Sequence, residues 1–93
     1  MQFMVVFRRS DAFDAADFEP LLAPEVQAAK ALYQSGTVRQ IWHRGDEAGA
    51  VLLLEADNRD QAQAKLNTLP MVEAKMLETV MLIPLQPYRG FAP

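Results

Sequence analysis

One glutamate stands out among the side chains that could do acid–base chemistry. Glu25 lies in a stretch of helical period and, at roughly 100° per residue, projects near the middle of an apolar arc about 160° wide. An ionised carboxylate is costly to bury alone, so we expect Glu25 to be paired, hydrogen-bonded, or raised in pKa into the range of a general base. Alternatively, Pro24 starts the helix and Glu25 only adds a favourable charge to its first turn. The other members of the arc are Leu21, Leu22, Val26, Ala28, Ala29, Leu32 and Tyr33.

Two further polar candidates share one stretch of alternating sequence, residues 37–44. Alternation places Arg39 and His43 on the same face of a strand. The unperturbed pKa of histidine lies near neutrality, so His43 could exchange protons with a substrate, although an ordinary surface histidine is the alternative. The planar guanidinium of Arg39 could bind a substrate carboxylate through two hydrogen bonds. Pairing with Glu55 or Asp57 is the alternative for Arg39.

Two aromatic side chains could complete a pocket for an apolar substrate. Trp42 lies on the predicted strand and Tyr88 lies near the C-terminus, and each combines a large apolar surface with one polar atom. Side chains of this size are also common in cores and interfaces, which is the alternative reading of both. The sequence therefore proposes Glu25 and His43 as catalytic residues, and Arg39, Trp42 and Tyr88 as substrate-binding residues.

Several classes of chemistry are excluded by what the sequence lacks. It contains no cysteine and one histidine, so disulfides, thiolate nucleophiles and the usual zinc or iron–sulfur sites are absent. No phosphate loop, dinucleotide fingerprint or Ser-His-Asp order occurs. Ser10 and Ser35 lie beside turns and are expected to cap rather than attack. We expect no metal and no cofactor.

Charge and hydropathy narrow the range of partners. The net charge of −3 does not favour binding to polyphosphate, so a nucleic acid partner is not expected. The longest uncharged apolar run, residues 48–54, falls far short of the roughly 20 residues that a membrane-spanning helix needs. The first residues lack the basic start of a signal peptide. We therefore expect a soluble, cytoplasmic protein that acts on a small molecule.

The spacing of apolar residues predicts four strands and two helices in 93 residues. Residues 2–9, 37–44, 50–56 and 76–85 read as strands, because apolar residues alternate in them or fill them. A helix is expected from about 14 to 34, complicated by Pro20 and Pro24 and stopped by Gly36, and another from the Asp57–Asp60 region to Leu69, closed by Pro70. Residues 86–93 form an extended arm that carries Tyr88 and Phe91.

The element order predicts one α+β domain over residues 1–93. A β-α-β-β-α-β order gives a four-stranded antiparallel sheet with both helices on one face. The strands at 50–56 and 76–85 carry apolar residues on both of their faces, so the face away from the helices also needs cover. A second subunit supplies that cover most simply, and we expect a homodimer.

Two segments carry a family resemblance. Glu25, followed by Leu-Tyr-Gln-Ser-Gly-Thr-Val-Arg-Gln-Ile-Trp at 32–42, resembles the helix-to-second-strand segment of muconolactone Δ-isomerase, and Leu-Pro-Met at 69–71 resembles a run before the last strand of that family. The stretches His-Arg-Gly-Asp at 43–46 and Pro-Tyr-Arg-Gly-Phe at 87–91 are most similar to muconolactone-isomerase-like proteins, which also resemble YCII-type domains.

The resemblance implies a fold and a reaction. The family belongs to the dimeric α+β-barrel superfamily, in which ferredoxin-like monomers pair sheet to sheet, hold cofactor-free pockets between sheet and helices, and assemble as dimers into larger rings. Glu25, Arg39 and Trp42 match a glutamate, an arginine and a tryptophan of the isomerase. Gln40 departs from its histidine, and His43 stands where it has arginine.

Two functions follow from this comparison. The first is a cofactor-independent isomerase or lyase that moves a proton alpha to a carbonyl on a small cyclic acid or lactone. Glu25 would act as the base, Arg39 would hold the substrate charge, and His43 or Tyr88 would donate to the enolate. The second is a non-catalytic dimeric module that binds a small ligand or assists another enzyme.

Overall fold

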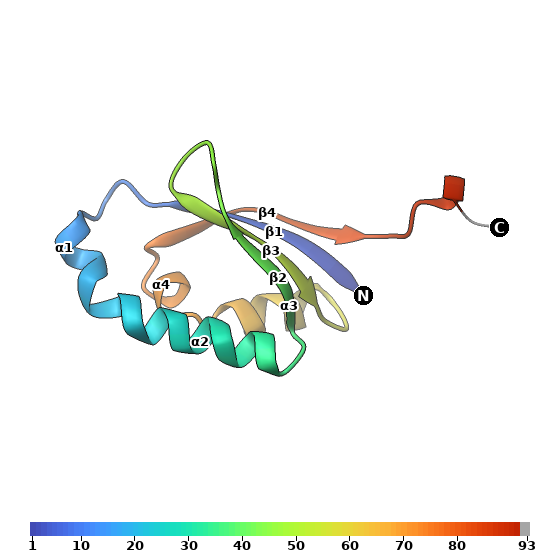
Figure 1. The fold of residues 1–93 in the computed structure, drawn as a ribbon, viewed down its shortest axis with the longest axis horizontal. Helices are drawn as coiled ribbons and strands as arrows, with labels where there is room; N and C mark the ends of the chain where they lie inside the picture. The colour runs from blue at the N-terminus through green and yellow to red at the C-terminus, as the bar shows by residue number, and fades with distance from the viewer. Residues whose placement is uncertain (92–93) are drawn as a thin grey trace.

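The strands form one antiparallel sheet with all of the long helices on one side of it. The computed structural model describes residues 1–91, and its strands are β1 (Gln2–Arg9), β2 (Val38–His43), β3 (Gly49–Glu55) and β4 (Leu77–Leu85). They pair in the order β2-β3-β1-β4, and the helices lie beneath the sheet (Figure 1). The predicted β-α-β-β-α-β architecture is confirmed.

Strand alternation determines which face of the sheet is buried. On the helix side, Phe3, Val5 and Phe7 of β1 and Leu52 and Leu54 of β3 are almost fully buried and form the centre of the core. Their neighbours in sequence point to the opposite side, called here the outer face. Several large apolar side chains of the outer face are exposed in the single chain. These are Met4, Trp42, Met81 and Ile83.

The predicted helix over residues 14–34 is divided into three pieces. They are α1 (Ala15–Phe18), the 3₁₀ turn η1 (Glu19–Leu21) and α2 (Leu22–Gln34). Asp14 caps α1, and its side chain accepts a hydrogen bond from the amide of Asp17. Pro20 falls in the 3₁₀ turn, whereas Pro24 is the third residue of α2, where an amide has no partner within the helix anyway. Pro24 therefore does not start α2, which begins two residues earlier at Leu22, but Pro24 and Glu25 both lie in the first turn, as the alternative for Glu25 expected.

The end of α2 confirms the predicted stop at Gly36. This glycine has a φ of 81°, in the left-handed region that side chains disfavour. The amide of Gly36 donates to the carbonyl of Tyr33 at 3.1 Å, and the amide of Thr37 donates to the carbonyl of Leu32 at 2.9 Å. This pair of bonds is the Schellman motif, which reverses the chain into β2.

The second helical region also differs from the prediction in one respect. Asn58 caps α3 (Arg59–Leu66), and its side chain accepts from the amide of Gln61. A single helix closed by Pro70 was expected, but Pro70 instead opens a separate short helix, α4 (Pro70–Glu73). Proline fits the first turn of a helix because its missing N–H is not needed there.

Each edge strand contains a β-bulge. The pairing of β1 with β4 shifts register between Val6 and Phe7, which leaves Val80 as an extra residue in β4. The pairing of β2 with β3 shifts between Val38 and Gln40, which leaves Arg39 as the extra residue. Strict alternation would place Val38 and Gln40 on one face, but they lie on opposite faces because the extra residue reverses the phase of the strand.

The chain beyond β4 extends away from the rest of the molecule. The predicted non-repetitive arm contains one 3₁₀ turn, η2 (Arg89–Phe91), and projects past the end of the sheet (Figure 1). Residues 92 and 93 of the predicted arm lie outside the described residues. The longest dimension of the molecule is 52 Å, against 28 Å and 20 Å for the other two.

Candidate functional site

Glu25 lies on α2 where this helix faces α4. Its Oε1 atom accepts a hydrogen bond from the backbone amide of Met71 at 2.9 Å, and the side chain is half-buried. Burial raises the pKa of the Glu25 carboxyl, and the hydrogen bond from Met71 opposes this only in part. The carboxylate is therefore a stronger base than an exposed glutamate, as its position in the apolar arc suggested.

The start of α4 explains why a carboxylate is accommodated there. Leu69 precedes the helix and has no side-chain atom that can accept a hydrogen bond, and Pro70 has no amide hydrogen. Met71 is therefore the first residue of α4 with an amide to satisfy, and Glu25 satisfies it from another helix. Residue types alone do not predict this contact. The one sequence signal for it is an apolar residue, Leu69, before a helix that begins with proline.

His43 lies on the helix side of β2. It pairs with Ala50 of β3, and its side chain is exposed at the edge of the sheet. Among residues 1–91, no hydrogen bond or ion pair joins Glu25 to His43 or to Arg39. One copy of the chain does not bring its two proposed acid–base residues into direct contact.

Arg39, the extra residue of the bulge in β2, lies near an acidic partner. Its Nη2 atom is 3.9 Å from Oε1 of Glu55, and its side chain is half-exposed. The other carboxylate oxygen of Glu55 is buried and has no hydrogen-bond partner within the described chain. Glu55 borders an open polar cleft of about 350 Å³. The cleft is also lined by Ser35, Gly36, Thr37, Asp57, Gln61 and Lys65.

The two aromatic candidates lie on different parts of the molecule. Trp42 pairs with Val51 and stands on the outer face, 49% exposed. Tyr88 lies on the projecting arm, 71% exposed, with its ring 4.8 Å from the ring of Phe91. The five predicted site residues are thus distributed over α2, both sides of β2, and the arm.

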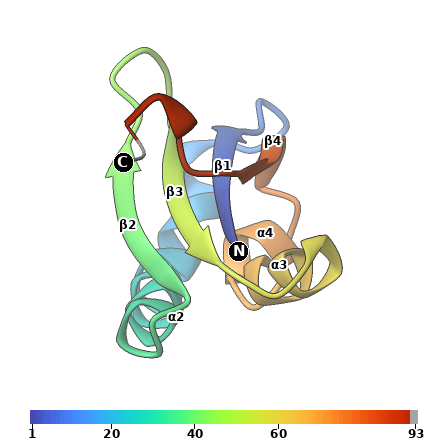
Figure 2. The same ribbon diagram turned by 90° about the vertical axis from the view of Figure 1, so that its right-hand side faces the viewer.

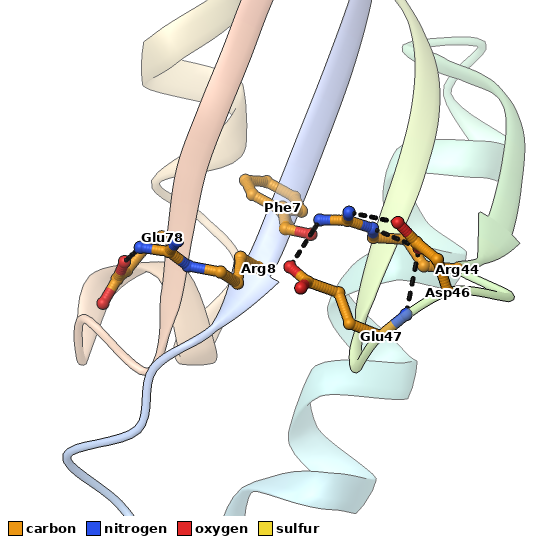
Figure 3. A network of polar contacts seen from close by, with 6 residues as sticks. All are labelled: Phe7, Arg8, Arg44, Asp46, Glu47 and Glu78. Carbon is orange, nitrogen blue, oxygen red and sulfur yellow. Dashed lines mark hydrogen bonds and ion pairs between the residues drawn. The ribbon is translucent and has the colours of Figure 1, made fainter.

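A polar network at the opposite end of β2 was not predicted. Arg44 is largely buried and donates to both carboxylate oxygens of Asp46, at 2.9 and 2.7 Å (Figure 3). It also pairs with Glu47 at 3.0 Å and approaches the carbonyl of Phe7 in β1 at 3.4 Å. Hydrogen bonding to Arg44 lowers the pKa of Asp46 to about 2. Arg44 thus connects the turn between β2 and β3 to the end of β1 through hydrogen bonds.

Gly49 makes this close approach possible. A Cβ atom at position 49 would collide with the carbonyl oxygen of Phe7 and would lie 2.9 Å from Cδ of Arg44. Glycine is therefore required by space at this position.

The described part of the chain has neither a metal-ligand cluster nor a membrane-spanning helix. Residues 1–91 contain no group of three His, Asp or Glu side chains that could hold a metal ion. The helices in the same range are too short and too polar to cross a membrane.

Comparison with known proteins connects this geometry to a family. The sequence profile described as muconolactone delta-isomerase matches residues 1–90. The chain belongs to the muconolactone delta-isomerase family. The match covers α2 with Glu25, all four strands and most of the arm, so the predicted family is confirmed.

Solved structures agree with this assignment at the level of the fold. A crystal structure of muconolactone isomerase superposes with a TM-score of 0.80 at 19% identity, covering 100% of this chain and 96% of that one. The 5-chloro-2-hydroxyhydroquinone dehydrochlorinase of Burkholderia phenoliruptrix AC1100, in complex with 2,5-dihydroxybenzoquinone, gives 0.76 at 13% identity, covering 97% and 98%. No curated protein sequence matches the chain.

Proposed function

We propose that this chain is a cofactor-independent isomerase or lyase that moves a proton alpha to a carbonyl on a small cyclic acid or lactone. Family membership supports a small-molecule enzyme of the isomerase or lyase type. The observation that carries the proposal is Glu25, a half-buried carboxylate with a raised pKa and no cationic partner among residues 1–91. A partly buried carboxylate with a raised pKa is suited to removing an activated C–H proton.

The hydrogen bond from Met71 assigns different roles to the two oxygens of Glu25. Oε1 is held by the backbone amide, so Oε2 is the oxygen left to accept a proton. The C–H electron pair would move into the carbonyl group to give an enolate, and Glu25 would return the proton to another carbon of the same conjugated system. Donors such as His43 or Tyr88 would stabilise the enolate oxygen, and Arg39 would hold the substrate carboxylate.

The proposed enzyme is a homodimer. Trp42, Met81 and Ile83 leave a broad apolar area on the outer face, and exposed apolar areas of this kind mark interaction sites. A second copy of the same sheet covers the area with matching side chains. Light scattering at micromolar protein should give twice the mass of the chain, and replacing Leu53 on the same face with Asp should give a monomer or an unfolded chain.

A non-catalytic ligand-binding or accessory module is the second candidate. The observation in its favour is that Glu25 already has a structural task, because it satisfies the amide of Met71 at the start of α4. A carboxylate kept only for this purpose would need no substrate.

The deciding experiment replaces the carboxylate while keeping an oxygen acceptor. Glu25→Gln retains the hydrogen bond from Met71 and removes the base, and Glu19→Gln is the matched control at an exposed position of η1. We expect turnover of muconolactone to fall by about 10²- to 10⁴-fold in the first variant and to stay unchanged in the second. Full activity in Glu25→Gln would remove Glu25 from the mechanism. Lactone binding without turnover in the natural chain would instead favour the accessory module.

A further inference from the structure

An open cavity lies beside the last residues of β1. It has a volume of about 340 Å³ and is bordered by the start of the loop after β1 and by the turn that joins β2 to β3. This loop leads to α1, at the end of the molecule opposite the N-terminus (Figure 1). Figure 2 views the molecule from the other end, so the loop lies behind the strands. We call this space the β1-end cavity, and its lining includes Arg8, Arg9, Asp11, Phe13, Glu47 and Ala48.

Two of the four charged side chains in this lining already have partners within the chain. Arg8 donates a hydrogen bond to Glu78 at 2.7 Å. Glu47 pairs with Arg44 at 3.0 Å. Figure 3 shows both pairs. The charges of Arg8 and Glu47 are therefore neutralised by neighbouring side chains.

Arg9 and Asp11 are the two lining charges that are left. Among residues 1–91, neither side chain forms a hydrogen bond or an ion pair, with the other or with any further residue. Both groups are available to a ligand, and their charges are opposite. A ligand with one negative and one positive group can satisfy both of them, whereas a ligand with a single charge leaves one of them unpaired.

The guanidinium group of Arg9 is held in place by an aromatic ring. Its Cζ atom lies 3.7 Å from the centroid of the Phe18 ring. Phe18 is buried and meets Phe13 edge to face, with the ring centroids 6.3 Å apart. The N–H groups of a guanidinium lie in its plane, so contact through its face leaves them free to donate. Arg9 can therefore bind a carboxylate through two parallel hydrogen bonds with little loss of side-chain freedom.

Hydrogen bonds of Ser10 fix the backbone between the two charged residues. The amide of Ser10 donates to the carbonyl of Met76 at 2.9 Å. Its side chain is buried, and its Oγ atom accepts from the amide of Ala12 at 3.2 Å. These contacts shape the turn that carries Asp11, so the spacing of Arg9 and Asp11 is set before a ligand arrives.

We propose that the β1-end cavity binds a small zwitterion, namely an α-amino acid with an apolar side chain. The carboxylate of the ligand binds Arg9, its ammonium group binds Asp11, and its side chain contacts Phe13 and Ala48. The lining carries two cations and two anions, so a ligand without net charge suits it better than a simple anion. The volume is at the lower end of the range for small-molecule pockets. This site contains none of the residues proposed for proton transfer, so it does not depend on the proposed function.

Three probes with one carbon skeleton test this selectivity in the full chain. L-Phenylalanine carries both charges, 3-phenylpropionate carries only the carboxylate, and phenethylamine carries only the ammonium group. NMR titrations report binding through the side-chain Nε–H signal of Arg9 and the backbone amides of residues 9–13. Phenylalanine should bind about tenfold more tightly than either other probe, because each of those lacks one charge-assisted hydrogen bond. Any other order of affinities, or no shift of these signals, would overturn the proposal.

Substitutions at the four lining charges provide matched controls. Arg9→Gln should abolish the preference for phenylalanine over phenethylamine, and Asp11→Asn should abolish the preference over 3-phenylpropionate. Arg8→Gln and Glu47→Gln change charges of the same cavity that are already paired, so affinity for phenylalanine should change by less than about twofold. Circular dichroism checks that all four variants are folded. An equal loss of affinity in Arg8→Gln and Arg9→Gln would contradict the proposal, because only the total charge of the cavity would then matter.

Arg9→Lys separates the charge at position 9 from its planar arrangement of donors. Lysine keeps the positive charge but lacks the paired N–H groups of a guanidinium. Phenylalanine should bind this variant roughly three- to tenfold more weakly than the natural chain, and still more tightly than Arg9→Gln. Equal affinity in Arg9→Lys and Arg9→Gln would contradict a role for the charge of Arg9 in binding.

Discussion

Glu25 and Asp46 are two carboxylates that the fold treats in opposite ways. Asp46 is exposed, accepts two hydrogen bonds from Arg44, and has a pKa of about 2. Glu25 is half-buried, accepts one hydrogen bond from a backbone amide, and has a raised pKa. A cation removes basicity from a carboxylate, whereas burial beside a neutral donor preserves it. The region around Asp46 is therefore suited to holding a turn, and the region around Glu25 to moving a proton.

The largest effect is expected in the turn region, at Gly49. Gly49→Ala should lower the free energy of unfolding by roughly 2–4 kcal/mol, because the added methyl group meets the Phe7 carbonyl and displaces Arg44. Chemical denaturation followed by circular dichroism measures this change.

Gly45→Ala is the control for that substitution. Gly45 lies in the same turn, but no atom lies within 4 Å of a Cβ placed there. Its unfolding free energy should stay within about 0.5 kcal/mol of the natural value. If both variants lose the same stability, then the turn is sensitive to any substitution and the tight contact at Gly49 is not the cause.

A smaller effect is expected from removing the acceptor at Glu25. Glu25→Ala leaves the amide of Met71 without its partner, and we expect it to be less stable than Glu25→Gln by about 1–2 kcal/mol. Hydrogen exchange at Met71 should become faster in the alanine variant alone. Equal stability of the two variants would mean that water replaces the carboxylate and that Glu25 does not hold α4.

The pH dependence of stability separates the two carboxylates further. The folded-state pKa of Glu25 is raised, so the folded chain binds the proton more tightly than the unfolded chain does. The resulting stabilisation is complete below the unfolded value near 4.5 and is lost as pH rises through the folded pKa. Glu25→Gln should therefore be more stable than the natural chain at pH 7, by less than about 1 kcal/mol for a half-exposed group. This advantage should vanish near pH 4. Thermal melts across this range measure it, and an advantage that grows toward acid would have the wrong sign.

Asp46 should show the opposite and smallest dependence. Its pKa is lowered from 3.8 to about 2, so its contribution is present above pH 4 and is lost as pH falls through 2. NMR signals of Arg44 should shift over this range, and Asp46→Asn should abolish the shift. The exposure of Asp46 makes the accompanying change in stability small.

Much of the fold could be predicted from periodicity. Alternating residues in β1 and the apolar run of β3 identified the strands, and Gly36 marked the end of α2. The prediction failed where one local signal has two meanings. The position of Pro70 after an apolar stripe predicts the end of a helix, but proline is equally suited to a first turn, and here it begins α4, where Glu25 accepts from the amide of Met71.

Less of the candidate site than of the fold could be predicted from the sequence. Position in an apolar arc indicated that Glu25 is partly buried, although Leu22, Val26 and Tyr33 of the same arc are exposed. Its partner is a backbone amide, however, and a backbone amide leaves no mark on residue type. The faces of β2 were misassigned because the extra residue at Arg39 changes the phase of the strand. Arg44 was missed because its partners depend on the shape of a turn that composition alone does not specify.

The two β-bulges also bear on how the chain avoids aggregation. Both lie in the pairing of edge strands, at Arg39 in β2 and at Val80 in β4, and β4 also contains Pro84, which has no amide to donate. Flat, regular edges invite strands of other molecules to add on and grow into fibrils. A bulge twists the edge and interrupts its row of donors and acceptors. Although 51% of its residues are hydrophobic, the chain therefore has two edge strands that pair poorly with the strands of other molecules, which disfavours amyloid formation.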